Sequence, residues 1–155
     1  MEIAIRHAQP GDLETLAELL RELFSLEADF VVDEMRQRRG LKLLLDGCGK
    51  HRCLLVAEHK GQVIGLCSAQ IVISTAEGGP AALVEDVVVA ARWRRQGVGC
   101  SLLAHIEDWA HRRGATRMQL LADRTNDRAL AFYAGIGWRS TQLVCLRKGV
   151  HHGRE

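Results

Sequence analysis

Residues 83–103 run from an apolar strand, through a short basic turn with two glycines, into an amphipathic helix. The N–H groups in the first turn of a helix have no partner inside the helix, and the macrodipole adds about half a positive charge there. Gly97 and Gly99 carry no Cβ that would keep an anion away from these amides, and nearby arginines add positive charge. The segment therefore predicts a site that holds a phosphorylated ligand.

Two common phosphate-binding motifs do not fit this spacing. A P-loop has Gly-Lys followed by Ser or Thr, whereas Gly99 is followed by Cys100 and Ser101. A dinucleotide-binding fingerprint needs a further glycine three residues on, and Leu102 stands there. What remains is Arg-x-x-Gly-x-Gly, which begins at Arg94, and this string alone also fits an ordinary strand-to-helix turn.

With its neighbours, the turn resembles the coenzyme A site of the GNAT superfamily of acyl-CoA N-acyltransferases. Its spacing is closest to that of the members that acetylate polyamines and other small amines. The family pattern runs from an acidic residue through an apolar strand to an aromatic residue, an arginine and two glycines. The matching residues are Glu85, Val87 to Val89, Trp93, Arg94, Gly97 and Gly99. A second block also matches, with Asn126, Phe132-Tyr133 and Gly137-Trp138.

The resemblance implies the GNAT fold, an α/β fold with a central mixed, mostly antiparallel twisted sheet flanked by helices. Apolar periodicity and turn residues predict the order βααβββαβαβ. The expected strands are 2–7, 52–59, 62–75, 83–89, 118–122 and 138–147, and the expected helices are 13–24, 29–45 with a possible break at Gly40, 98–113 and 127–134. In the family, the parallel strands that correspond to 83–89 and 118–122 splay apart at the ligand.

The resemblance further implies that acetyl-CoA is the acyl donor. Backbone groups of the strand would hold the pantetheine arm, and backbone amides of the turn would hold the pyrophosphate. The implied cofactor-binding residues are Val87, Val88, Val89, Arg94, Arg95, Gln96, Gly97, Val98, Gly99, Cys100 and Asn126. The valines also fit a buried strand, and Asn126 also fits a helix cap.

Acyl transfer needs a base, because an amine must lose its proton before it attacks a thioester. An alkylamine, with a pKa of about 10.4, needs more help at neutral pH than an α-amino group with a pKa of about 8. In an unbulged strand, Glu85 shares one face with Val87 and Val89. In family members that acetylate polyamines, a glutamate at this place is the base, so the resemblance implies this role for Glu85; a structural ion pair is the alternative.

Two further side chains belong to the predicted chemistry. Asp86 points to the opposite face of an unbulged strand, and we interpret it as structural or as a partner for substrate charge. Tyr133 is the only tyrosine and matches the family's acid position, from which it would protonate the leaving thiolate. The alternative is that Tyr133 only packs on the sheet, as we expect of Phe132.

The predicted reaction is transfer of an acetyl group to a primary amine of a small molecule. Residues 24–39, with acidic residues in and beside them, would form part of the acceptor wall; a solvated helix face is the alternative. These acidic residues are Glu22, Glu27, Asp29, Asp33 and Glu34. A protein or peptide acetyltransferase and a non-catalytic acyl-CoA sensor stay open as rival functions.

Composition limits the remaining possibilities. With 155 residues, 47% of them hydrophobic and 26% charged, the chain predicts one domain at 1–148 and a polar tail at 149–155. A net charge of +2 gives no reason to expect a nucleic-acid or membrane partner. A terminal strand that leaves a sheet edge open predicts a homodimer.

The five cysteines form no Cys-x-x-Cys pair, which favours buried, reduced thiols in a cytoplasmic protein. This interpretation includes Cys67, Cys100 and Cys145, which stand in apolar or strand-like sequence. Cys48 and Cys53 lack a second pair of ligands, so no metal is expected. We also expect no signal peptide and no membrane helix, since no stretch approaches about 20 apolar residues.

Overall fold

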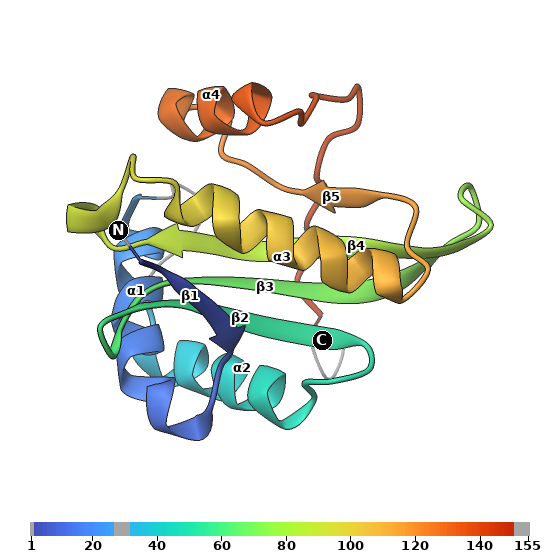
Figure 1. Cartoon of the computed structure of the whole chain (residues 1–155). Helices are drawn as coiled ribbons and strands as arrows, with labels where there is room; N and C mark the ends of the chain where they lie inside the picture. The colour runs from blue at the N-terminus through green and yellow to red at the C-terminus, as the bar shows by residue number, and fades with distance from the viewer. Residues whose placement is uncertain (1, 27–31, 151–155) are drawn as a thin grey trace, which may run out of the picture. The chain divides into compact units, whose positions relative to one another are not determined.

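The structure of the chain is a computed structural model that describes residues 2–26 and 32–150. It divides into two compact units, Met1–Leu120 and Leu121–Glu155. Among the described residues, the first unit holds a five-stranded sheet and helices α1 to α3, and the second holds helix α4 (Figure 1).

Most elements lie close to their predicted positions. The strands are β1 (Ala4–His7), β2 (Arg52–His59), β3 (Gln62–Ser74), β4 (Gly79–Val89) and β5 (Met118–Leu120). The helices are α1 (Leu13–Leu26), α2 (Glu34–Asp46), α3 (Val98–Arg112) and α4 (Asp127–Gly135), with short 3-10 turns η1 (Pro10–Asp12) and η2 (Ala91–Trp93). Strand β4 begins earlier than predicted and β5 ends earlier, while the predicted positions 29–31 lie outside the described residues.

The strands lie side by side in the order in which they occur along the chain. The first three pairs are antiparallel, whereas β4 and β5 are parallel and are joined through α3. Parallel neighbours require such a crossover, because a tight turn can connect only antiparallel strands. The predicted mixed, mostly antiparallel sheet is confirmed.

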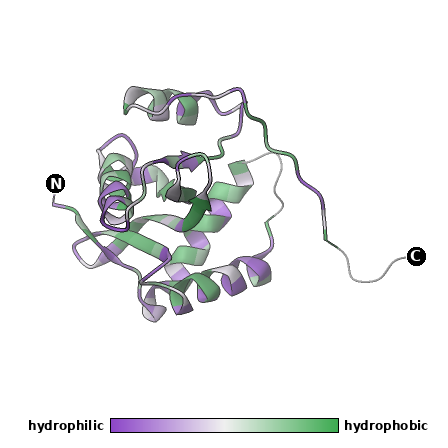
Figure 2. Cartoon of the chain, turned by 90° about the vertical axis from the view of Figure 1, so that its right-hand side faces the viewer, coloured by the Kyte–Doolittle hydropathy of each residue, from purple (hydrophilic) through white to green (hydrophobic). Residues whose placement is uncertain are grey.

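The helices of the first unit cover opposite faces of this sheet. Alternate residues of β3 point to opposite faces. Leu66 lies in a hydrophobic core with Val88 and with buried residues of α1 and α2. A Cβ on its neighbour Gly65 would instead meet Leu102 and Val98 of α3. Figure 2 shows the largely hydrophobic strands between α1 and α2 on one side and α3 on the other.

Local sequence explains where α1 and α2 form. Helix α1 buries one apolar stripe, which consists of Leu16, Ala17, Leu19 and Leu20. Helix α2 begins after Asp33, whose carboxylate accepts a hydrogen bond from the backbone N–H of Arg36 at 3.1 Å. It continues through Gly40, so the possible break predicted there is wrong. None of the described helices combines the length and apolar character that a membrane span requires.

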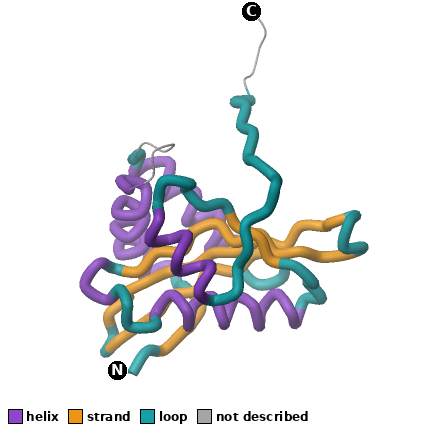
Figure 3. Tube along the Cα trace, turned by 90° about the horizontal axis from the view of Figure 1, so that it is seen from above, coloured by secondary structure: helices purple, strands orange, loops and turns teal. Residues whose placement is uncertain are grey.

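The β3–β4 hairpin extends beyond the helices, and the loop between its strands lies at the far end (Figures 1 and 3). Its outer part is paired from Ile71 with Ala82 to Ser74 with Gly79. Ile73, near the tip, is 75% exposed, since no helix reaches this part of the hairpin. The residues of β4 that were predicted for the site, Glu85 and Val87 to Val89, lie at the other end of the strand.

The second unit is built around α4. Asn126 caps this helix, with its side-chain oxygen accepting a hydrogen bond from the backbone N–H of Ala129 at 3.1 Å. Tyr133 stands between two other rings, with centroid distances of 5.2 Å to Phe132 and 5.8 Å to Trp138. The predicted short helix after Asn126 is confirmed.

The predicted final strand at 138–147 is wrong. Residues 139–150 are drawn as loop in Figure 3, and within the described residues they take part in no β-ladder. High β-propensity does not make a strand unless the backbone N–H and C=O groups find a neighbouring strand. Leu143 and Leu146 accordingly stay 86% and 90% exposed, and the observed order is βααβββαβα.

The close approach of α3 to β3 gives a prediction about stability. A Cβ at Gly65 would lie 3.0 Å from the backbone oxygen of Val88 and 3.3 Å from Leu102. We expect Gly65→Ala to lower the free energy of unfolding by about 1–3 kcal/mol, as overpacking does. Urea denaturation measures the change. A Cβ at Gly40 of α2 would meet no neighbouring heavy atom within 4 Å, so Gly40→Ala should instead raise the free energy of unfolding by about 0.5–1 kcal/mol. Equal effects of the two substitutions would contradict this packing.

Candidate active site

The turn between β4 and α3 has the backbone that the glycine pattern predicts. Gly97 is the N-cap of α3 with a φ of 87°, and Arg95 also has a positive φ, of 62°. Left-handed backbone costs a residue with a Cβ about 1–2 kcal/mol, so Arg95 is a strained position in this turn. In the described part of the chain, no hydrogen bond uses the backbone N–H groups of residues 95–100. These amides and the exposed Arg95 form a cradle that suits an anion.

Arg94 ties this turn to the rest of the first unit. Its Nε donates to the backbone oxygen of Val89 at 3.0 Å, and its Nη2 donates to Oε1 of Glu22 at 2.8 Å. The guanidinium therefore links the turn to the end of β4 and to α1. Glu22 was predicted for the acceptor wall, but its carboxylate is engaged by this ion pair.

The turn also carries an aromatic contact that the sequence did not reveal. The guanidinium of Arg92 lies 5.4 Å from the ring centroid of Trp93, and the Trp93 ring lies 4.8 Å from that of His59. His59 belongs to the end of β2, next to the β2–β3 turn. His59 comes close to the β4–α3 turn only in the folded sheet, and no motif around it in the sequence predicts this contact.

Strand β4 carries a β-bulge at the two acidic residues. Cys67 and Ala69 of β3 pair with Val87 and Val84, so two steps along β3 correspond to three along β4. The prediction that Glu85 shares a face with Val87 and Val89 assumed an unbulged strand, and this premise is wrong. The extra residue interrupts the alternation of side chains between Val84 and Val87.

The register settles the faces on either side of this bulge. Gly65, Cys67 and Ala69 alternate along β3 on the face toward α3, so their partners on β4 also face α3. Those partners are Val89, Val87 and Val84. Ser68 shares the opposite face with Leu66, toward α1 and α2, and its hydroxyl bonds to the Asp86 carboxylate. Asp86 therefore faces the α1–α2 side, while Glu85 is exposed.

The far edge of β4 is only partly paired within the first unit. The parallel ladder with β5 runs from Ala82 with Met118 to Val84 with Leu120 and ends there. Val87, Val88 and Val89 pair with β3 but lie beyond this ladder. Within the first unit, the parallel ladder thus ends before β4 reaches the predicted pantetheine contacts.

The remaining predicted site residues lie in the second unit or are engaged locally. Tyr133 stands in the aromatic group of α4, and Asn126 has the capping role that was its alternative. Of the acidic residues predicted for the acceptor wall, Asp33 caps α2 and Glu34 forms an ion pair with Arg21. Glu27 and Asp29 lie outside the described residues.

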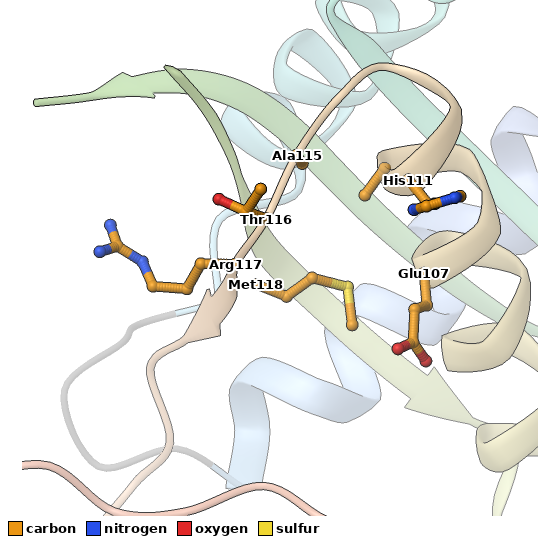
Figure 4. A pocket seen from close by; sticks show the side chains of 7 residues that line it. Glu107, His111, Ala115, Thr116, Arg117 and Met118 are labelled. Atoms are coloured by element: carbon orange, nitrogen blue, oxygen red, sulfur yellow. The ribbon is translucent and has the colours of Figure 1, made fainter. Parts of the chain in front are cut away.

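A pocket of about 380 Å³ lies at the other end of α3, between the end of this helix and the start of β5 (Figure 4). Glu107, His111 and Met118 gather on one side of it, whereas Arg117 points away from them. None of its lining residues was predicted for the site. A helix of this length places its two ends roughly 20 Å apart, so the pocket and the glycine turn are separate features.

The cysteines only partly follow their prediction. All five are free thiols, but Cys100 and Cys145 are exposed rather than buried. Burial raises the pKa of the Cys53 thiol to about 12. Burial, and to a smaller extent the nearby Asp86 carboxylate, also raises the pKa of the Cys67 thiol. Among the described residues, no group of three or more His, Cys, Asp or Glu side chains has an arrangement that could hold a metal ion.

Sequence comparison assigns these features to a family. The model of the acetyltransferase (GNAT) family matches residues 13–138, which includes β4, the glycine turn and α4. The chain belongs to the GNAT acetyltransferase family. The predicted family and enzyme class are thereby confirmed, and the match crosses the boundary between the two compact units.

One curated relative is an aminoglycoside N(6')-acetyltransferase type 1 from Serratia marcescens. It is 29% identical to this GNAT protein over 72 residues. That match covers 46% of this chain and 49% of the relative, so it spans about half of each.

Solved structures confirm the GNAT fold. A possible acetyltransferase from Clostridium difficile 630 superposes with a TM-score of 0.84 at 22% identity, over 98% of this chain and 100% of that one. The aminoglycoside N-acetyltransferase AAC(6')-Iy, solved in complex with CoA, superposes with a TM-score of 0.80 at 19% identity, over 96% and 95% of the two chains.

Thiol accessibility gives a direct prediction for this part of the molecule. With iodoacetamide at neutral pH, Cys100 should be alkylated well before Cys53 and Cys67, because the buried thiols are inaccessible and stay protonated. Peptide mass spectrometry follows each site over time, and alkylation in denaturant provides the reference in which all the sites react. Labelling of Cys53 as fast as Cys100 in the native protein would contradict the burial described.

Proposed function

We propose that this protein is an acetyl-CoA-dependent N-acetyltransferase that acts on a primary amine of a small molecule. The observation that most supports this proposal is the turn of residues 94–100. There, left-handed backbone precedes α3, and the first amides of the helix have no protein partners in the described chain. Family membership supports the reaction class, and the CoA complex of a protein with the same fold supports the donor.

The donor would bind along the end of β4 and across the turn. Backbone amides of residues 95–100 would hold the pyrophosphate, assisted by the charge of Arg95 and by the dipole of α3. Backbone groups of Val87 to Val89, which lie beyond the β4–β5 ladder, would hold the pantetheine arm. In this proposal Arg94 keeps the turn in place through Val89 and Glu22.

The acceptor amine must lose a proton before its nitrogen attacks the thioester carbonyl carbon. We propose Glu85 as the base, acting directly or through water, because it lies exposed at the bulge next to the proposed pantetheine contacts. As the carbon–nitrogen bond forms, the carbon–sulfur bond breaks and the thiolate leaves. Tyr133 is the proposed acid that gives this sulfur a proton.

The acceptor is proposed to be a small cationic amine. The curated relative is named as an aminoglycoside acetyltransferase, and two consecutive acidic residues, Glu85 and Asp86, occupy the bulge of β4. Negative charge at this place would attract a protonated amine before the base takes its proton. A peptide acceptor and a non-catalytic acyl-CoA sensor are the rival functions, and turnover measurements separate them.

We expect purified protein to release coenzyme A from acetyl-CoA in the presence of polyamines or aminoglycosides. The assay follows free thiol against a panel that also contains amino acids and peptides, with acetyl-CoA alone as the blank. Turnover only with peptides would favour the protein-modifying function. Calorimetric binding of acetyl-CoA without turnover of any amine would favour the sensor and contradict the proposal.

The two proposed proton-transfer residues can be tested separately. Glu85→Gln and Tyr133→Phe should each lower kcat by about a hundredfold or more, because general acid–base groups contribute about 10²–10⁴-fold. Binding of acetyl-CoA, measured by calorimetry, should stay within about twofold for Glu85→Gln, since this carboxylate is assigned to the acceptor. Unchanged kcat in either variant would remove that residue from the mechanism.

We further propose that residues 1–148 act as one acetyltransferase domain in a cytoplasmic homodimer. The family match across both compact units supports a single functional domain. The five free thiols fit a reducing compartment, and β5 is an edge strand of the sheet in the first unit, the kind of strand that can pair with a second chain.

A further inference from the structure

Ser68 is the one polar side chain in the run from Val63 to Ala69 of β3. It is 1% exposed, and the residues on either side of it, Cys67 and Ala69, are fully buried. Burial of a hydroxyl lowers the stability of the fold unless the hydroxyl is hydrogen-bonded. The hydrogen-bond partners of Ser68 therefore indicate why a polar residue stands in this apolar part of the strand.

Both partners of the Ser68 hydroxyl belong to Asp86. The backbone N–H of Asp86 donates to Oγ at 3.3 Å, and Oγ donates to Oδ2 of the Asp86 carboxylate at 3.3 Å. One hydroxyl thus serves as acceptor for the backbone and as donor for the side chain of the same residue. This bridge fixes the Asp86 backbone and its carboxylate together.

The bridge lies at the β4 bulge. Ser68 stands opposite the extra residue, between the pair Cys67–Val87 and the pair Ala69–Val84. A bulge leaves the ladder locally disrupted, so a backbone N–H there needs another acceptor. The Ser68 hydroxyl supplies one, which an alanine or any apolar residue at this place would not.

We propose that Ser68 is a positioning residue: its hydroxyl holds the β4 bulge in one conformation and thereby sets the directions of the Glu85 and Asp86 carboxylates toward the acceptor amine. This inference rests on the proposed function of the site. Ser68 itself does not touch the reacting atoms, since it is buried beneath the bulge while Glu85 is exposed. It acts through the strand that carries the proposed base.

The bulge explains why such a device is needed. In an unbulged strand, Glu85 and Asp86 would point to opposite faces of the sheet. The extra residue removes this alternation and places both residues opposite Ser68. A misplacement of about 1 Å in a catalytic group can cost about a hundredfold in rate, so a bridge that fixes the bulge affects kcat.

Ser68→Ala is the direct test, and Ser74→Ala is its matched control. Ser74 is the other buried polar residue of β3, and its Oγ accepts a hydrogen bond from the backbone N–H of Glu77 at 3.1 Å. Both substitutions remove a buried serine hydroxyl that serves a backbone amide of the same hairpin. Only Ser68 serves a residue of the bulge.

The first measurement is amide hydrogen exchange, which does not depend on activity. We expect the Asp86 amide to exchange about tenfold faster in Ser68→Ala than in the wild type, because it loses its buried acceptor. In Ser74→Ala its rate should not change. Unchanged exchange at Asp86 in Ser68→Ala would show that the hydroxyl does not hold the bulge, and would overturn the proposal.

The second measurement is steady-state turnover with the best amine found for the wild type. Ser68→Ala should lower kcat by about tenfold to a hundredfold and leave KM for acetyl-CoA within about twofold, because the donor site is unchanged. Ser74→Ala should keep both constants. A higher KM for acetyl-CoA with unchanged kcat, or an equal fall of kcat in both variants, would indicate a general structural role and overturn the proposal.

A double-mutant cycle with Asp86→Asn tests whether Ser68 acts through this residue. If it does, adding Ser68→Ala to Asp86→Asn lowers kcat by less than it does in the wild type; fully additive effects contradict the bridge. Where Ser68→Ala does not fold, Ser68→Cys keeps the side-chain volume with weaker hydrogen bonds and should show a smaller change of the same kind. Faster exchange at Asp86 in a protein without any amine turnover would show that the proposed function fails although the bridge exists.

Discussion

The left-handed backbone at Arg95 and Gly97 fixes where α3 begins, and the candidate site depends on that start. In α4 the side chain of the N-cap residue Asn126 takes up one of the first amides of the helix, whereas the N-cap of α3 is a glycine that has no side chain to do so. The observed turn leaves the backbone N–H groups of residues 95–100 without protein partners in the described chain, and Arg94 holds the turn against β4 and α1. The burial of Val98, Leu102 and Ile106 on the sheet then keeps α3 in position. A donor site made mainly from backbone thus depends on side chains that lie outside it.

Strand β4 combines two departures from a regular strand within a few residues. The bulge changes which residues face α3, and the ladder to β5 ends at Val84. Together they leave an exposed glutamate beside backbone groups that have no partner on the β5 side within the first unit. A regular interior strand that is paired along its whole length offers neither feature, because neighbouring strands engage both of its edges and its side chains alternate strictly. The chemistry that we propose for β4 is therefore a consequence of its irregularity.

Sequence patterns predicted the parts of the fold that local chemistry determines. Apolar spacing located α1 and α3, and the order of acidic, aromatic, arginine and glycine residues located the turn. The bulge was not predictable in this way, because it depends on how β3 and β4 align. The Arg94–Glu22 pair joins residues 72 positions apart, which local patterns do not connect. The predicted final strand is wrong because local sequence alone does not make a strand. Leu143 and Leu146 stand in strand-like sequence but have no ladder partner among the described residues.

The central claim is that backbone amides of residues 95–100 hold the diphosphate of coenzyme A. Backbone amide resonances in a titration with coenzyme A, with pantetheine as the comparison ligand, test it most directly. The account predicts large shifts at residues 95–100 with coenzyme A and no such shifts with pantetheine, which lacks the diphosphate. Binding of coenzyme A that leaves these amides unmoved, or that moves them no more than pantetheine does, would contradict it.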